Sequence, residues 1–212
     1  MKNLKITVIF FLLIALSCVF IICTPSKIDQ NAKTEFEQEI DLISKAKKAQ
    51  RFCADNGMNQ DFCILIDMSK HSGKNRFYVW SFIDEEPIAE YLVTHGCGDN
   101  PWSLDHSKTN PKFSNTEDTH LSSLGKYKIG DRGWSNWGVN INYRLHGLDK
   151  TNSNANNRDI VFHSWEEIAD TEVYPAGTPE GWGCPAISDN AFLALDKLLK
   201  IQIKPTLMWI YN

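Results

Sequence analysis

The sequence predicts a mainly β fold of the β-rich α+β kind, with antiparallel strands between two flanking helices. Segments rich in aromatic and β-branched residues recur between residues 63 and 211. Stretches with helical periodicity, residues 34–54 and 189–200, lie at either end of that region. The 212 residues include 11 Phe, 7 Trp and 6 Tyr. That is ample apolar material for one domain with a single core.

Three strands are expected in the first half, at residues 63–68, 76–83 and 88–94, in an antiparallel meander. Residues 97–123 are rich in Asn, Asp, Ser and Pro and are expected to form a long loop. Ser188 is a suitable N-cap for the second helix. Further strands are expected at residues 125–129, 138–145, 159–163 and 206–211.

The N-terminus has the pattern of an export segment. Lys2 and Lys5 precede residues 6–22, which carry no charge. A cleaved signal peptide, a membrane anchor and a lipoprotein signal ending at Cys18 all fit this pattern, and all three place the domain outside the cytoplasm. We therefore divide the chain into an export segment (1–24), a linker with the N-terminal helix (25–60) and a C-terminal domain (61–212).

Charge and cysteine content narrow the function further. The net charge is −4 and there is no long Lys/Arg run, so a nucleic-acid partner is not expected. Outside the cytoplasm disulfides persist, and we favour Cys53–Cys63, which would join a helix end to a strand start. Cys97 and Cys184 then need another explanation. A Cys97–Cys184 disulfide is an alternative that would make activity depend on redox state.

Cys184 has the surroundings of a nucleophile. It lies in the segment Gly181-Trp182-Gly183-Cys184, where glycines allow a ligand to approach the backbone closely. The predicted second helix begins a few residues later, and a helix N-terminus favours the thiolate. His163 ends a predicted strand, followed by Ser164. A strand end beside a loop can present this imidazole to the thiol as a base.

These residues belong to a series of motifs that resembles the L,D-transpeptidase catalytic (YkuD-type) domain, in its murein L,D-transpeptidase subfamily. The resemblance covers residues 61–211 and implies an L,D-transpeptidase-like antiparallel β-sandwich with flanking helices. The matching pieces, in order, are His95-Gly96, Phe113-Ser114-Asn115, Ser122-Ser123-Leu124-Gly125, Leu145-His146-Gly147-Leu148, a looser element with Asn154, Ala155 and Arg158, His163, and Trp182-Gly183-Cys184-Pro185-Ala186.

The resemblance implies a chemistry. Cys184 attacks the carbonyl between the L-centre diamino acid and the terminal D-Ala of a peptidoglycan stem tetrapeptide. His163 is the general base, the carbonyl of Ser164 orients it, and N–H groups near Gly183 stabilise the oxyanion. An amine from a second stem peptide then forms a cross-link, whereas water gives hydrolysis. No metal or other cofactor is implied, and no oligomeric state is predicted.

Two departures from the common family motif affect the substrate contacts. Trp182 replaces a His two residues before the nucleophile, and Ala186 replaces an Arg two residues after it. Arg158 or Arg144 could supply the missing positive charge. The expected substrate-binding residues are His95, His146, Arg158 and Trp182.

Other interpretations stay open from the sequence. Thr94-His95-Gly96-Cys97 looks like the common Ser/Thr-His-Gly-Cys motif but lacks a partner His at the right distance. The same scaffold could serve an L,D-carboxypeptidase or endopeptidase, or an inactive wall-binding module. A zinc site from His95, His146, His163 and Cys184 lacks any paired ligand spacing.

Overall fold

The computed structural model describes residues 27–99 and 111–212, with side chains from residue 36 onward. The chain divides into a unit at Met1–Gln38 and a second unit at Glu39–Asn212. The helices are α1 (Lys27–Asp55), the short 3-10 helix η1 (Lys150–Asn152) and α2 (Asp189–Leu199). The strands are β1 (Phe62–Asp67), β2 (Phe77–Ser81), β3 (Glu86–Tyr91), β4 (Gly125–Trp134), β5 (Ile141–Gly147), β6 (Val161–Ser164), β7 (Ala186–Ile187) and β8 (Leu207–Tyr211).

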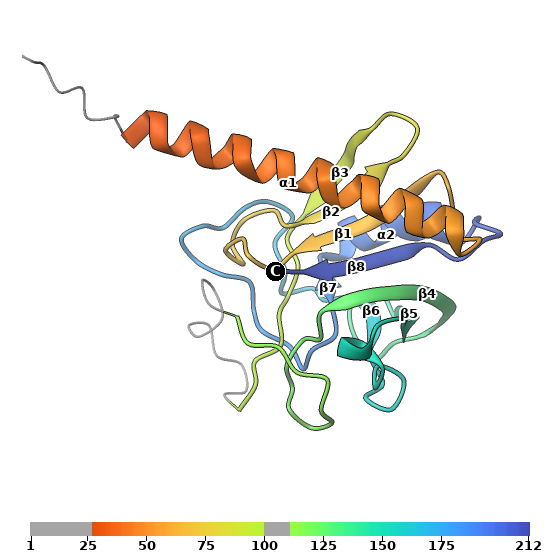
Figure 1. The fold of residues 1–212 in the computed structure, drawn as a ribbon. Helices are drawn as coiled ribbons and strands as arrows, with labels where there is room; N and C mark the ends of the chain where they lie inside the picture. Colours follow the sequence, from red (N-terminus) through yellow and green to blue (C-terminus); the bar gives the residue numbers. More distant parts are fainter. Residues whose placement is uncertain (1–26, 100–110) are drawn as a thin grey trace, which may run out of the picture. The chain divides into compact units, whose positions relative to one another are not determined.

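All eight strands form one sheet in the order β3-β2-β1-β8-β4-β5-β6-β7. The last strand, β8, therefore lies in the middle of the sheet, between β1 and β4 (Figure 1). The mainly β class is confirmed, and most neighbours are antiparallel as expected. Two pairs are parallel, β1 with β8 and β6 with β7, because in each case the chain returns through a long connection rather than a hairpin.

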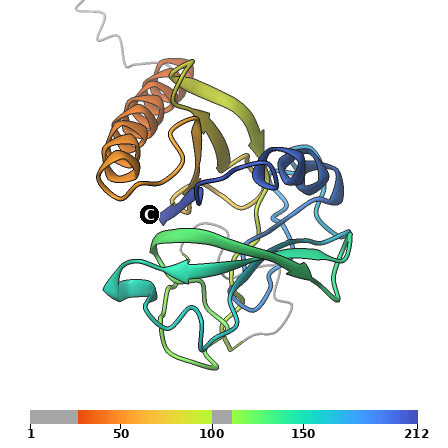
Figure 2. The same ribbon diagram turned by 90° about the vertical axis from the view of Figure 1, so that its right-hand side faces the viewer.

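One face of the sheet carries the main core. Alternate residues of nearly every strand contribute to it, including Ile64, Tyr127, Leu145 and Phe162, and Phe192 of α2 packs against them. Because both halves of the sheet bury side chains in the same core, the sheet bends around it (Figure 2). Ser188 caps α2 as predicted, since its hydroxyl accepts a hydrogen bond from the N–H of Ala191.

The other face of β1, β2 and β8 is covered by the second half of α1. Ala46, Ala49 and Cys53 of the helix pack there together with Cys63 of β1. Both cysteines are buried free thiols, so the favoured Cys53–Cys63 disulfide is not present in the structure. Burial in this apolar layer raises the pKa of Cys53 to about 12 and also raises the pKa of Cys63.

Several boundaries differ from the sequence expectations. Strand β4 runs on to Trp134 because a register shift between Ile129 and Arg132 bends it and lets pairing with β5 continue. Where it is described, the expected loop 97–123 contains one isolated bridge, between Phe113 and Ser122, and no helix or longer strand. The export segment lies outside the described residues. Within the described ranges, no helix has the length and apolarity needed to cross a bilayer.

Candidate active site

The pairing of β6 with β7 brings the predicted nucleophile and base to one place. His163 of β6 lies opposite Ala186 of β7, and Cys184 precedes Ala186 by two residues. The N–H of Val161 lies 3.4 Å from Sγ of Cys184 and donates to it. Cys184 and His163 both line a cavity of about 320 Å³. Its wall also includes Thr94, Trp137, Trp165 and Trp182.

The imidazole of His163 is held in a defined orientation. Its Nδ1 lies 2.8 Å from the carbonyl oxygen of Ser164. A carbonyl can only accept, so Nδ1 carries the proton and Nε2 of the neutral ring has a lone pair. The Ser164 hydroxyl accepts from the N–H of Val139 at 2.9 Å, which ties the end of β6 to the β4–β5 turn.

The thiol of Cys184 is protonated at rest. Burial raises its pKa, and the nearby N–H of Val161 and the charge of Arg158 offset only part of that rise. Burial also lowers the pKa of His163 below its usual 6.5. Sγ faces the carbonyl of Asp159 at 3.9 Å, and no hydrogen bond between the described residues joins it to His163. Both shifts favour a neutral thiol and a neutral imidazole over an ion pair.

The backbone before the nucleophile has a shape that only glycine allows. Gly183 has φ +96°, and a Cβ built on it would lie 2.5 Å from the carbonyl oxygen of Leu121. Among the described residues, no hydrogen bond uses the N–H groups of Gly183 or Cys184. Two adjacent N–H groups beside a nucleophile are the usual donors to an oxyanion.

The segment that follows β3 runs beside the nucleophile segment and supports it. The N–H of Thr94 donates to the carbonyl of Ala186 at 3.0 Å, and its Oγ accepts from the N–H of Ala186 at 2.9 Å. The same hydroxyl donates to the carbonyl of Cys184 at 3.1 Å. Two more backbone bonds join His95 and Cys97 to Gly181. Thr94-His95-Gly96-Cys97 is therefore a neighbouring segment of the site, and Cys97 is buried with its Sγ toward the carbonyl of Gly98.

Arg158 is used to hold the loop that contacts Gly183. Its guanidinium donates to the carbonyl oxygens of Ser114 and Leu121, at 2.9 and 2.6 Å, and to the hydroxyl of Ser123. A predicted carboxylate-binding arginine is thus engaged by three oxygens of the chain itself. Arg144, the other candidate, pairs with Asp159 at the surface.

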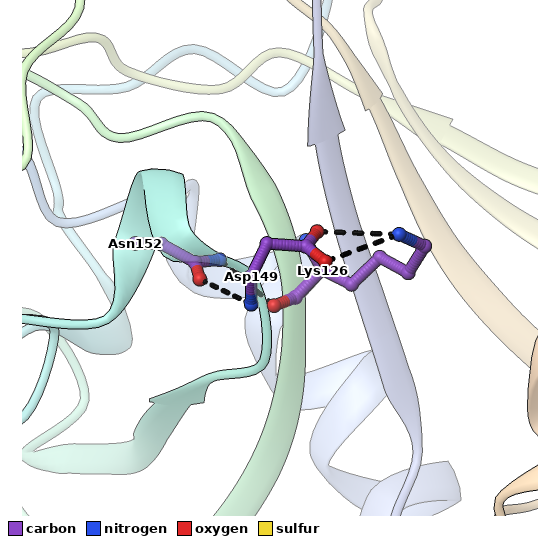
Figure 3. A network of polar contacts seen from close by, with 3 residues as sticks. All are labelled: Lys126, Asp149 and Asn152. Atoms are coloured by element: carbon purple, nitrogen blue, oxygen red, sulfur yellow. Dashed lines mark hydrogen bonds and ion pairs between the residues drawn. The ribbon is translucent and has the colours of Figure 1, made fainter.

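The turn that carries Arg158 is anchored to the sheet by a polar network (Figure 3). The backbone N–H and the Nζ of Lys126 both bind the carboxylate of Asp149. The N–H of Asp149 donates to the side-chain oxygen of Asn152, whose amide nitrogen donates to the carbonyl of Lys126 at 2.8 Å. Asn152 is fully buried. The start of the 150–158 segment is therefore fixed to β4.

The other predicted substrate contacts are placed differently. Trp182 is 58% exposed, lines the cavity and stacks on His120 with ring centroids 4.7 Å apart. His95 is fully buried against Phe113, and neither ring nitrogen has a hydrogen-bond partner among the described residues. Burial and the charge of Arg76 lower the pKa of His95 to about 3. His146 lies on β5 opposite Lys128, outside the cavity lining.

Thr94 was not assigned to the site from the sequence, and it was left open whether Trp137 and Trp165 form a stacking wall with Trp182; all three residues line the cavity. Trp137 lies in the tight β4–β5 turn, where its N–H donates to the hydroxyl of Ser135. Its ring meets Trp165 edge to face. The signal for the two tryptophans is that several tryptophans lie near the His163 and Cys184 motifs in the sequence. In the described part of the chain, no group of three or more His, Cys, Asp or Glu side chains is arranged to hold a metal ion.

The described geometry defines a β-rich protein with a cysteine and a histidine at one cavity. The family model of the L,D-transpeptidase catalytic domain matches residues 30–211. The chain belongs to this family. No curated protein sequence gives a significant match.

Solved structures show a weak overall likeness. The Bdellovibrio bacteriovorus protein Bd1075 is 14% identical, with a TM-score of 0.44 over 74% of this chain and 49% of that one. The Xylanimonas cellulosilytica L,D-transpeptidase is 11% identical, with a TM-score of 0.39 over 76% and 68%. The helical cell shape determining protein Pgp2 of Campylobacter jejuni is 11% identical, with a TM-score of 0.41 over 72% and 48%. The chain spans about half the length of the first and third.

Proposed function

We propose that this chain is an exported L,D-transpeptidase that acts on peptidoglycan stem peptides through a Cys184 acyl-enzyme, with His163 as general base. One observation carries the proposal. The bond from Nδ1 of His163 to the Ser164 carbonyl leaves the basic Nε2 in the same cavity as the thiol. That is the tautomer which a general base needs.

The reaction begins with a turn of the thiol. Sγ of Cys184 leaves the Asp159 carbonyl and donates to Nε2 of His163 as the substrate enters. The imidazole takes the proton while Sγ attacks the carbonyl that precedes the terminal D-Ala. The N–H groups of Gly183 and Cys184 receive the developing oxyanion. His163 then protonates the departing amine of D-Ala, and the acyl group remains on Sγ as a thioester.

The remaining predicted contacts receive uneven support. Trp182 is a substrate contact because it is exposed at the cavity. Arg158 acts on the site through the loop it holds, and its charge lies close enough to lower the pKa of Cys184. His95 and His146 stay predictions as substrate contacts. Export is proposed from the apolar segment that follows Lys2 and Lys5.

The test is the intact mass of the full-length chain in detergent, after incubation with a stem tetrapeptide and, separately, with a carbapenem. Cys184→Ala and Cys97→Ala variants are run in parallel, with and without reductant. We expect an acyl adduct that disappears only in Cys184→Ala. An adduct lost only in Cys97→Ala would move the nucleophile to Cys97. The absence of any adduct in the reduced protein would favour an inactive wall-binding module.

A further inference from the structure

The cavity beside Cys184 has a wall made largely of tryptophan. Trp137 comes from the β4–β5 turn, Trp165 follows β6, and Trp182 precedes the nucleophile. Trp137 is 48% exposed and Trp182 58% exposed, so both present indole surface to a ligand. Ala186 adds a methyl group, and Thr94 is turned to backbone partners. A volume of about 320 Å³ lies at the lower end of the range for small-molecule pockets.

This wall offers nothing that binds a carboxylate. Apart from Cys184 and His163, no described residue that lines the cavity can carry a charge. Ala186 stands where the common family motif has an arginine. Arg158, whose guanidinium lies beside Gly183, is bonded to Ser114, Leu121 and Ser123. A ligand group with a carboxylate beside its reacting atom would lose hydration here and gain no partner.

We infer that the tryptophan-walled cavity is the acceptor subsite. It takes a primary amine carried on an unbranched hydrocarbon stem, with no carboxylate on the carbon that bears the nitrogen. This inference rests on the proposed function, because it concerns the fate of the acyl-enzyme. Methylene groups gain from burial against indole, and an ammonium group is attracted to the indole face.

The same wall favours transfer over hydrolysis. An apolar surrounding lowers the pKa of an amine, so more of it is present as the nucleophilic free base. Occupation by the hydrocarbon stem also displaces water from the thioester.

The transfer step is balanced without any further reagent. The amine nitrogen attacks the thioester carbonyl carbon, and a C–N bond forms while the C–S bond breaks. Nε2 of His163 accepts the proton that the nitrogen loses and returns it to Sγ of Cys184. The products are an amide and the free thiol enzyme.

The experiment measures how the acyl-enzyme divides between amide and hydrolysed acid. The full-length chain is acylated with a stem tetrapeptide in the presence of Nα-acetyl-L-lysine amide or, separately, glycine, whose amine adjoins a carboxylate. Mass spectrometry gives the ratio of amide to acid. The variants are Trp182→Ala, Trp137→Ala and Trp182→Phe. Trp134→Ala is the matched control, because Trp134 is 72% exposed and does not line the cavity.

We expect the wild type to prefer the lysine amide to glycine. Trp182→Ala and Trp137→Ala should lower the amide-to-acid ratio with the lysine amide about tenfold, the usual effect of lost apolar contact in a pocket. Trp182→Phe should retain most of it, and Trp134→Ala should match the wild type. The ratio does not depend on how much acyl-enzyme forms, so partial loss of folded protein does not alter it.

Two results would overturn this inference and leave the proposed function unaffected. An acyl-enzyme whose ratio is the same in Trp182→Ala, Trp137→Ala and Trp134→Ala would show that the wall does not bind the acceptor. Equal or better transfer to glycine would show that a cation serves the acceptor carboxylate. A chain that forms no acyl-enzyme on Cys184 would instead overturn the proposed function, and the inference with it.

Discussion

Replacing Thr94 with valine should slow acylation of Cys184 much more than it destabilises the protein. The hydroxyl of Thr94, a fully buried residue, bridges the carbonyl of Cys184 and the N–H of Ala186. Valine keeps the shape but removes both bonds, and it leaves the N–H of Ala186 without a partner. A buried unsatisfied group costs about 1–3 kcal/mol.

The loss of the bridge also frees the backbone on both sides of the nucleophile. A displacement of about 1 Å at a reacting group can cost roughly 100-fold in rate, so we expect a 10- to 100-fold slower acylation. Mass spectrometry of samples quenched at successive times gives the rate of acylation, and urea unfolding gives the free energy of unfolding. Thr94→Ser restores the hydroxyl and should recover most of the rate.

The matched control is Thr206→Val. Thr206 is equally buried and accepts a hydrogen bond from Asn59, but it lies away from the cavity. It should lose a similar amount of stability with little change in acylation. Equal slowing in the two valine variants, or no recovery in Thr94→Ser, would refute a positioning role for the Thr94 hydroxyl.

Three further predictions follow from the site. Because burial lowers the pKa of His163 and its neutral form is the base, kcat/KM should rise with pH to a plateau, with a midpoint below the usual 6.5 of a histidine, and show no thiol ionisation near neutrality; a rate that falls between pH 6 and 8 would indicate an ion pair. Gly183→Ala should reduce acylation by roughly 100-fold, since its Cβ meets the Leu121 carbonyl, whereas Gly181→Ala, whose Cβ meets nothing within 4 Å, should lose far less. His95 has a pKa of about 3 in the folded protein and protonates near pH 6.5 only in the unfolded chain. The free energy of unfolding therefore decreases as the pH falls below 6.5. At pH 5 the loss is about 2 kcal/mol, and His95→Leu should reduce the difference in unfolding free energy between pH 7 and 5 by that amount, while an unchanged difference would contradict its burial as a neutral ring.

Local signals predicted what depends on local chemistry. Ser188 has a side chain suited to capping, and it caps α2. The buried strand β1 follows from the apolar run at residues 62–66. The position of β8 between β1 and β4 could not be predicted in the same way, because the sequence of a strand does not indicate which strands it pairs with. Arg158 was likewise identified as a charge near the substrate, but its partners at Ser114 and Leu121 come from a segment about 40 residues earlier.

The two cysteine motifs show why spacing alone was insufficient at the site. Thr94-His95-Gly96-Cys97 has the letters of the common nucleophile motif, yet Cys97 is buried outside the cavity lining. Gly183-Cys184 lacks the expected histidine, yet its thiol lies in a cavity with His163. The difference arises from which segment lies beside β6. Residues 186–187 pair with β6 directly, whereas residues 94–97 bond to residues 181–186 from the far side. The first segment therefore carries the proposed nucleophile, and the second holds the backbone of that segment.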